Sequence, residues 1–182
     1  DFVLVKRNHE GEDTILKIFD RKSKFSRMDS FNKIEQTVAA NFDYVLILTS
    51  MNKDYNIKRL DRYLASAWES GATPVIVLTK SDTTDDAEWF IRNTEENAIG
   101  VPIAAVSSIT GEGIEELKRI FKPRSTIVLL GSSGVGKSSL LNALSGKEVM
   151  KVKEIREDDS KGRHTTTHRQ LITLEDGIMI ID

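Results

Sequence analysis

The stretch at residues 131–138 combines the residue types that hold phosphate groups. It reads Gly-Ser-Ser-Gly-Val-Gly-Lys-Ser, which is a glycine, four residues, and then glycine, lysine and serine. Glycines let the backbone fold its N–H groups into a concave nest for anions, a lysine here reaches the β- and γ-phosphates, and a serine hydroxyl ligates Mg²⁺. The pattern predicts a phosphate-binding loop (P-loop) for a nucleoside di- or triphosphate, formed by Gly131, Ser132, Ser133, Gly134, Val135, Gly136, Lys137, Ser138 and Ser139.

A Gly/Ser-rich turn without a ligand is the alternative interpretation of these residues. The flanking sequence favours the P-loop, because an apolar run at 127–130 precedes the glycines and a helical pattern with Leu140, Leu141 and Leu144 follows them. In that setting we expect Lys137 to stabilise charge on the transferred phosphate and Ser138 to ligate Mg²⁺.

Two further loops carry residues that could select the base. Thr79, Lys80 and Asp82 follow one apolar run, and Ser107 and Ser108 follow the next. A carboxylate can accept both the N1–H and the exocyclic amine of guanine, which adenine does not offer together. The lysine stem can lie flat on the base, and the backbone at the second loop can meet the guanine O6. The tetrapeptide at 79–82 is weak alone, but with the P-loop it predicts guanine specificity.

These loops must be positioned by an alternation of strands and helices that begins at residue 42. Apolar runs at 43–49, 74–78, 102–106 and 126–130 predict strands, and the patterns at 56–69, 85–97 and 113–121 predict helices. Such alternation predicts an α/β fold with a mostly parallel sheet covered by helices on both faces. Ligands of such a sheet bind beyond the carboxyl ends of the strands, where the three loops fall.

Two helix starts and one tryptophan can be assigned from spacing. Asn56 is the expected cap of the first helix, and Asp85 and Glu88 are spaced as a capping box for the second. Trp68 continues the apolar spacing of the first helix, so we expect it in the core rather than at a ligand.

The chain before residue 42 has a different pattern. Residues 2–7 and 14–19 predict a hairpin, which is too small to be stable alone and is expected to be the tail of a small β-domain. Residues 21–27 are basic with one aromatic, Phe25. This segment could contact a phosphate backbone or be a solvated linker, and the sequence leaves both open.

Composition bounds the remaining possibilities. The chain has 182 residues, 39% hydrophobic and 30% charged, no cysteine and a net charge of -2. These values are typical of a soluble globular protein without disulfides or thiolate metal sites, and they predict no overall attraction to nucleic acid or membrane. With no bilayer-length apolar run and no visible signal peptide, we expect a cytoplasmic protein. Because it starts without methionine, we expect an excerpt of a longer chain.

Residues 147–169 are dense in charge and nearly free of large apolar groups. Such a segment cannot build a core of its own, so we expect nucleotide and metal to order it, as in a switch segment. A solvated threonine-rich loop is the alternative.

Together these pieces resemble the ribosome small subunit-dependent GTPase A family. The base motifs precede the P-loop here, whereas most GTPases have the reverse order, so the resemblance implies a circularly permuted P-loop GTPase fold. Segments 21–27, 60–64 and 162–167 also resemble that family, and the likeness covers nearly the whole chain. Thr79 stands where most GTPases have asparagine.

The resemblance implies an activity and its cofactors. It implies a GTPase (GTP hydrolysed to GDP and phosphate) with Mg²⁺ held by Ser138, by Thr166, with Thr165 as the next candidate, and by Asp182, where a D-x-x-G motif would begin. We take His164 as the nearest residue able to orient the attacking water. The implied partners are the small (30S) ribosomal subunit and its rRNA, without a membrane, and we expect a monomer.

The resemblance also implies domains beyond these residues. Residues 1–20 would end an oligonucleotide-binding (OB) barrel, 21–41 would be a basic linker, and 42–182 would be the GTPase domain cut at the start of switch II. Zn²⁺ would be bound only in a helical domain that follows. Two other functions stay open: an RNA-binding scaffold with a structural guanine nucleotide, and a P-loop kinase or ATPase with an accidental base motif.

Overall fold

A six-stranded sheet forms the centre of the structure, a computed structural model that describes residues 1–9, 11–28, 34–150 and 170–181. The strand order is β7-β6-β5-β8-β10-β9. Neighbouring strands run parallel except for the antiparallel pair β9–β10. The mostly parallel sheet expected from the sequence is therefore confirmed. Its strands are β5 (Tyr44–Ser50), β6 (Thr73–Thr79), β7 (Ile103–Val106), β8 (Thr126–Leu130), β9 (Leu171–Thr173) and β10 (Met179–Ile181).

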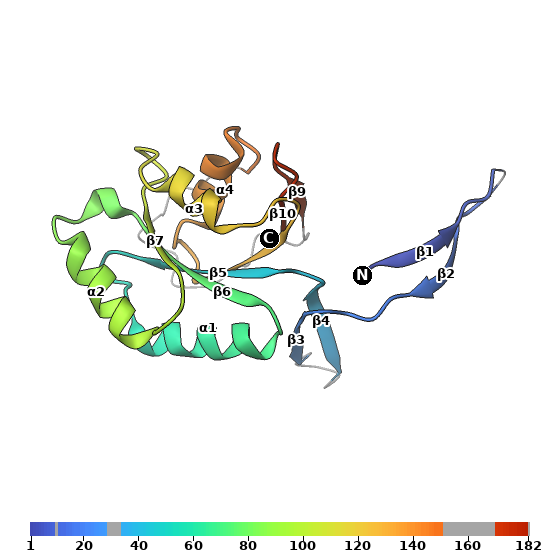
Figure 1. Ribbon diagram of the computed structural model, residues 1–182, viewed down its shortest axis with the longest axis horizontal. Coiled ribbons are helices and arrows are strands. Elements are labelled where there is room, and N and C mark those ends of the chain that lie inside the picture. Colours follow the sequence, from blue (N-terminus) through green and yellow to red (C-terminus); the bar gives the residue numbers. More distant parts are fainter. Residues whose placement is uncertain (10, 29–33, 151–169, 182) are drawn as a thin grey trace.

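Helices cover both faces of the sheet (Figure 1). One face is covered by α1 (Ile57–Glu69) and α2 (Ala87–Asn97), and the other by α3 (Ile114–Ile120) and α4 (Lys137–Ser145). The centre of strand β5 is apolar because both of its faces are buried: Val45 and Ile47 join the core under α1, while Leu46 and Leu48 join the core under α3 and α4. The strand ends in two buried polar residues, Thr49 and Ser50.

The two predicted helix starts have different outcomes. Asn56 caps α1, because its side-chain oxygen accepts a hydrogen bond from the Arg59 backbone N–H at 3.0 Å. The predicted cap of α2 at Asp85 is wrong by one residue. The N-cap is Asp86, whose carboxylate accepts a hydrogen bond from the Trp89 backbone N–H at 3.2 Å. This N–H lies in the first turn of the helix and has no partner within it.

The expectation that Trp68 lies in the core is wrong, because its side chain is 58% exposed. The buried stripe of α1 consists of Leu60, Leu64 and Ala67, which are spaced by four and three residues and face the sheet. Each residue turns the helix by about 100°, so the position after Ala67 lies at the rim of this stripe.

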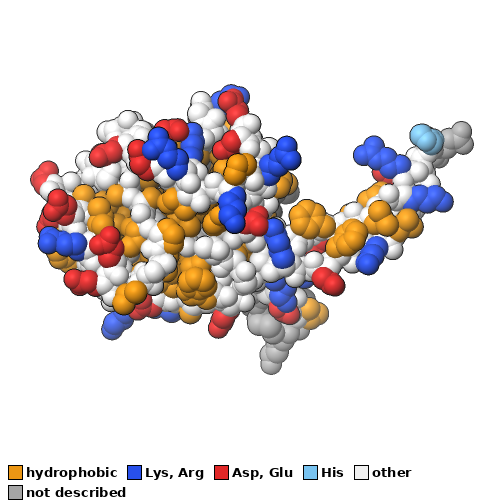
Figure 2. Space-filling model, in the orientation of Figure 1, with side chains coloured by type: hydrophobic (Ala, Val, Ile, Leu, Met, Phe, Trp, Pro, Cys, Tyr) orange, Lys and Arg blue, Asp and Glu red, His pale blue; other side chains and the backbone are white. Residues whose placement is uncertain are grey.

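The N-terminal part forms two antiparallel hairpins. Strands β1 (Val3–Lys6) and β2 (Thr14–Ile18) confirm the predicted hairpin, which extends away from the body as an arm (Figure 1). Its apolar side chains are exposed, and Figure 2 shows them along the arm. The exposed members are Phe2, Val3, Leu4, Val5, Ile15, Leu16, Ile18 and Phe19.

The segment expected to be a linker contains the second hairpin, β3 (Lys24–Met28) with β4 (Glu35–Ala40). It is attached to the body by the buried Ser23, whose hydroxyl exchanges two hydrogen bonds with the Phe42 backbone at 2.6 and 2.7 Å. Its cations Arg21, Lys22 and Lys24 each contact a carboxylate within 2.7 Å. These ion pairs lie at the surface, and contact of the segment with a phosphate backbone stays a prediction.

Candidate nucleotide-binding site

Four loops leave the carboxyl ends of four adjacent parallel strands. They follow β5, β6, β7 and β8, and so they gather at one edge of the sheet. The base loops predicted after β6 and β7 and the phosphate loop predicted after β8 are among them. The fold thus brings together segments that are more than fifty residues apart in sequence.

The phosphate loop has the geometry that its glycines allow. Gly136 has a φ of 106° and stands at the start of α4, a backbone conformation that L-residues rarely adopt. A Cβ atom on Gly131 would lie 3.0 Å from both the Leu48 carbonyl oxygen and a Val135 methyl group. The loop therefore packs tightly against the end of β5, so a side chain at Gly131 would be crowded, and one at Gly136 would strain the backbone.

Lys137 and Ser138 lie in the first turn of α4. The ammonium group of Lys137 donates to the carbonyl oxygens of Gly131 and Ser132, each at 2.8 Å, so its positive charge lies over the loop. Ser138 and Ser139 are half-buried, and no hydrogen bond within the described residues engages the Ser138 hydroxyl. A hydroxyl at this position has the oxygen chemistry that Mg²⁺ prefers, so the residue fits the ion.

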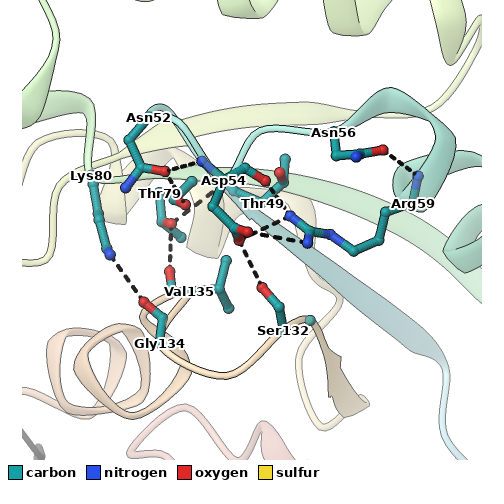
Figure 3. A network of polar contacts seen from close by, with 12 residues as sticks. Thr49, Asn52, Asp54, Asn56, Arg59, Thr79, Lys80, Ser132, Gly134 and Val135 are labelled. Atoms are coloured by element: carbon teal, nitrogen blue, oxygen red, sulfur yellow. Dashed lines mark hydrogen bonds and ion pairs between the residues drawn. The ribbon is translucent and has the colours of Figure 1, made fainter. Parts of the chain in front are cut away.

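The first base loop is tied directly to the phosphate loop (Figure 3). The Thr79 hydroxyl, in a side chain only 2% exposed, donates to the Val135 carbonyl oxygen at 2.7 Å. The Lys80 ammonium donates to the Gly134 carbonyl oxygen at 2.9 Å. Asp82 is exposed in a short 3₁₀ helix, Ser81–Thr83, and its carboxylate is accessible to a base.

The second base loop is stabilised by hydrogen bonds to the buried side chain of Ser107. This residue is fully buried, and its hydroxyl oxygen accepts hydrogen bonds from the backbone N–H groups of Ile109 and Thr110 at 3.2 and 3.1 Å. Gly113 closes the loop with a φ of 74°, where a Cβ atom would lie 2.0 Å from the Ala105 carbonyl oxygen. Ser108 is half-buried. The Ser107 side chain thus stabilises the loop from inside, and the ligand contact of Ser108 stays a prediction.

Sequence reasoning missed a third group of residues at this edge. The Ser132 hydroxyl donates to the Asp54 carboxylate at 3.0 Å, and Arg59 forms an ion pair with the same carboxylate at 2.9 Å (Figure 3). The strand pattern could have indicated these residues. Strand β5 ends at the same edge of the sheet as the base loops, and Asp54 lies in the loop that follows β5.

Several predicted site residues lie outside the described residues. His164, Thr165, Thr166 and Asp182 belong to this group. Within the residues that the structure describes, no cluster of three or more histidine, cysteine or acidic residues could hold a metal ion. In the same part of the chain, no helix has the length and apolar character that crossing a bilayer requires.

The order of these loops along the chain defines the class of protein. The sheet places the phosphate loop at the same edge as both base loops, but both base loops come before the phosphate loop in the sequence. The fold and the site are those of a circularly permuted P-loop GTPase. Residues 18–182 match the model of the family described as RsgA GTPase. The chain therefore belongs to the RsgA GTPase family, as the sequence resemblance implied.

Curated relatives and solved structures agree with this family. The chain is 53% identical over 182 residues to "Small ribosomal subunit biogenesis GTPase RsgA 1" of Listeria innocua serovar 6a, covering 100% of this chain and 51% of the relative. It is 42% identical over 184 residues to the RsgA protein of Methanosarcina acetivorans, again over 100% of this chain and 50% of the relative. The chain thus spans about half the length of these relatives.

Two crystal structures have the same fold. YjeQ from Thermotoga maritima superposes with a TM-score of 0.73 at 28% identity, covering 99% of this chain and 58% of that chain. YloQ, titled as a circularly permuted GTPase, gives a TM-score of 0.68 at 25% identity over 99% of this chain and 54% of that chain.

Proposed function

We propose that this chain is the guanine-nucleotide-binding part of a GTPase that acts in maturation of the small ribosomal subunit. The observation that carries the proposal is the direct connection of the first base loop to the phosphate loop. Thr79 and Lys80 donate to Val135 and Gly134 at 2.7 and 2.9 Å, so a base and a phosphate chain bound at these loops would be held at a set separation. Family membership and the names of the relatives support the same function.

The roles of the site residues follow from their positions. Asp82 accepts from the guanine N1–H and exocyclic amine, the Lys80 stem packs on the base, and the backbone at Ser108 donates to O6. The backbone N–H groups of residues 131–139 and the Lys137 ammonium bind the phosphates, with the positive end of α4 directed at the same charges.

Mg²⁺, if bound with the nucleotide, would neutralise charge on the β- and γ-phosphates and so assist transfer of the γ-phosphoryl group. Within the described residues Ser138 is the ligand that fits it. Thr166 and Asp182 are the further ligands of the proposal.

Hydrolysis transfers the γ-phosphoryl group from the GDP leaving group to a water oxygen. Lys137 stabilises the charge that develops on the oxygen between the β- and γ-phosphorus atoms as that bond breaks. His164 is proposed to orient the water. Its replacement by alanine should lower the single-turnover rate while GTP affinity is retained, and loss of affinity at an unchanged rate would refute the role.

The partner is the small ribosomal subunit with its rRNA, and the protein acts as a cytoplasmic monomer. With a net charge of -2, these residues do not supply the electrostatic attraction that RNA binding needs. We place the main RNA contacts on the remaining half of the full-length protein. Zn²⁺ is likewise assigned to that part.

The test is GTP turnover and co-sedimentation of the full-length protein with isolated small and large subunits. We expect slow intrinsic hydrolysis, strong activation by small subunits, and tighter binding with a non-hydrolysable GTP analogue than with GDP. Equal pelleting with both subunits would refute the proposed partner. Subunit binding without any activation of turnover would instead favour a scaffold in which guanine nucleotide is structural, and preference for ATP would refute the nucleotide specificity.

A further inference from the structure

The loop between β5 and α1, residues 51–56, contacts the phosphate loop through the side chain of Asp54. The Asp54 carboxylate accepts a hydrogen bond from the Ser132 hydroxyl at 3.0 Å (Figure 3). The carbonyl oxygen of the same serine accepts from the Lys137 ammonium at 2.8 Å. Ser132 is thus held on one side by Asp54 and on the other by the lysine that faces the phosphates.

Asp54 is itself held by a two-point ion pair. The two terminal nitrogens of the Arg59 guanidinium lie 3.1 and 2.9 Å from the two carboxylate oxygens, and one of them also donates to the Asp54 backbone carbonyl. A forked pair of this kind restricts the orientation of the carboxylate as well as its position. Arg59 comes from the first turn of α1, which Asn56 caps, so the pair is built on a helix rather than on the loop alone.

The first half of the loop that carries Asp54 is a turn stabilised by the side chain of Asn52. The Asn52 side-chain oxygen accepts from the Ser50 hydroxyl and from the Asp54 backbone N–H, both at 2.9 Å. Such a turn fixes the backbone at Asp54 without help from secondary structure.

The next residue, Tyr55, anchors the loop on α2. Its ring lies edge-on to Phe90 and Trp89 at 5.0 and 5.8 Å, and its hydroxyl contacts Asn93 and Thr94 at 3.1 and 2.8 Å. Burial raises the pKa of Tyr55, so its hydroxyl stays protonated and able to donate. Asp54 is therefore presented from a rigid support.

The charge of this arrangement has a consequence for phosphate binding. The Asp54 carboxylate contacts the phosphate loop through the Ser132 hydroxyl, so an unpaired charge there would repel bound phosphates. The ion pair with Arg59 neutralises this charge. The hydrogen bond to Ser132 needs only an acceptor oxygen, whereas the ion pair to Arg59 needs the negative charge. The two functions of Asp54 can therefore be separated by substitution.

We propose that Asp54, held and neutralised by Arg59, is a positioning residue that fixes the phosphate loop at Ser132 and thereby slows the release of bound nucleotide. This inference rests on the proposed function and deepens it. It concerns nucleotide binding and not hydrolysis, so it can be tested by measuring nucleotide release alone.

The first test measures dissociation of N-methylanthraniloyl-GDP from the full-length protein by stopped flow. Asp54→Ala and Ser132→Ala should each raise the dissociation rate by about threefold to tenfold, because each removes one charge-assisted hydrogen bond that is partly exposed to solvent. The double variant should be no faster than Asp54→Ala, since that variant already removes the contact with Ser132. Ser132→Thr, which keeps the hydroxyl, should raise the rate less than Ser132→Ala does.

The second test separates charge from structure. Asp54→Asn keeps an acceptor for Ser132 and should speed dissociation less than Asp54→Ala does. Arg59→Gln leaves the carboxylate unpaired and should speed dissociation more at low than at high salt, and adding Asp54→Asn should restore the slower rate. A merely structural Arg59 would give no such rescue.

The matched control is Lys118→Ala, which breaks the exposed Lys118–Glu115 ion pair of α3 away from the loop. Wild-type dissociation rates in Asp54→Ala and Ser132→Ala, or additive effects in the double variant, would overturn the inference while leaving the proposed function intact. Failure of the wild-type and Lys118→Ala proteins to bind the probe would remove the proposed function and this inference with it.

Discussion

Thr79 and Val135, which are 56 positions apart in the chain, are joined by a buried hydrogen bond of 2.7 Å between the threonine hydroxyl and the valine carbonyl oxygen. The bond connects the last residue of β6 to the middle of the phosphate loop. Because the acceptor is a backbone atom, the bond controls the path of the loop itself and not the position of a side chain.

Thr79→Val should therefore loosen the phosphate loop. The substitution preserves shape but leaves the Val135 carbonyl without its donor, at a cost of about 1–3 kcal/mol. We expect a lower melting temperature and faster GDP release. Thr79→Ser, which keeps the hydroxyl, is the matched control, and equal stability of the valine and serine variants would contradict the role assigned to this bond.

Asp82→Asn should change the base preference. An amide nitrogen replaces an acceptor where the guanine amine must donate, so GTP affinity should fall by roughly tenfold to a hundredfold while xanthosine triphosphate binding improves. Competition of both nucleotides against a labelled GDP measures the change. Asp85→Asn, at an exposed carboxylate beyond the 3₁₀ helix, should have no effect. Unaltered discrimination in Asp82→Asn would exclude Asp82 as the base contact.

Ser107→Ala should disorder the second base loop without removing a ligand contact. The backbone N–H groups of Ile109 and Thr110 both lose their acceptor, which is buried, and we expect about 1–3 kcal/mol of lost stability. Guanine nucleotide affinity should fall as a consequence, and added GDP should recover part of the melting temperature. The opposite pattern, lost affinity at full stability, would mean that the Ser107 side chain contacts the base directly.

Ser138→Ala should weaken the dependence of nucleotide binding on magnesium. The variant retains the backbone N–H groups and Lys137. In the presence of a chelator, GDP should therefore bind to the variant as tightly as it binds to the wild-type protein under the same condition. Addition of Mg²⁺ should tighten binding in the wild type and much less in the variant. A Mg²⁺ response of wild-type size in Ser138→Ala would show that another residue supplies the protein ligand.

Local sequence was sufficient for the parts of the fold that depend on neighbouring residues. The glycines and lysine at 131–138 predicted the phosphate loop, and apolar runs and helical spacing predicted the helices and the parallel strands from β5 to β8. These features depend on backbone freedom and on burial of one or both faces of an element, which are properties of a short segment. The same reasoning placed Asn56 at the start of α1, where its contact is only three residues away.

The tertiary structure decided what depends on residues far apart in the chain. No local pattern distinguishes Trp68, exposed at the rim of α1, from Ala67 beside it, because the direction of the sheet determines which of the two is covered. The hydrogen bonds from Thr79 to Val135 and from Ser132 to Asp54 span 56 and 78 positions, and each exists only because parallel strands end at one edge of the same sheet. Sequence determined which residues could bind a nucleotide, and strand order determined which of them meet.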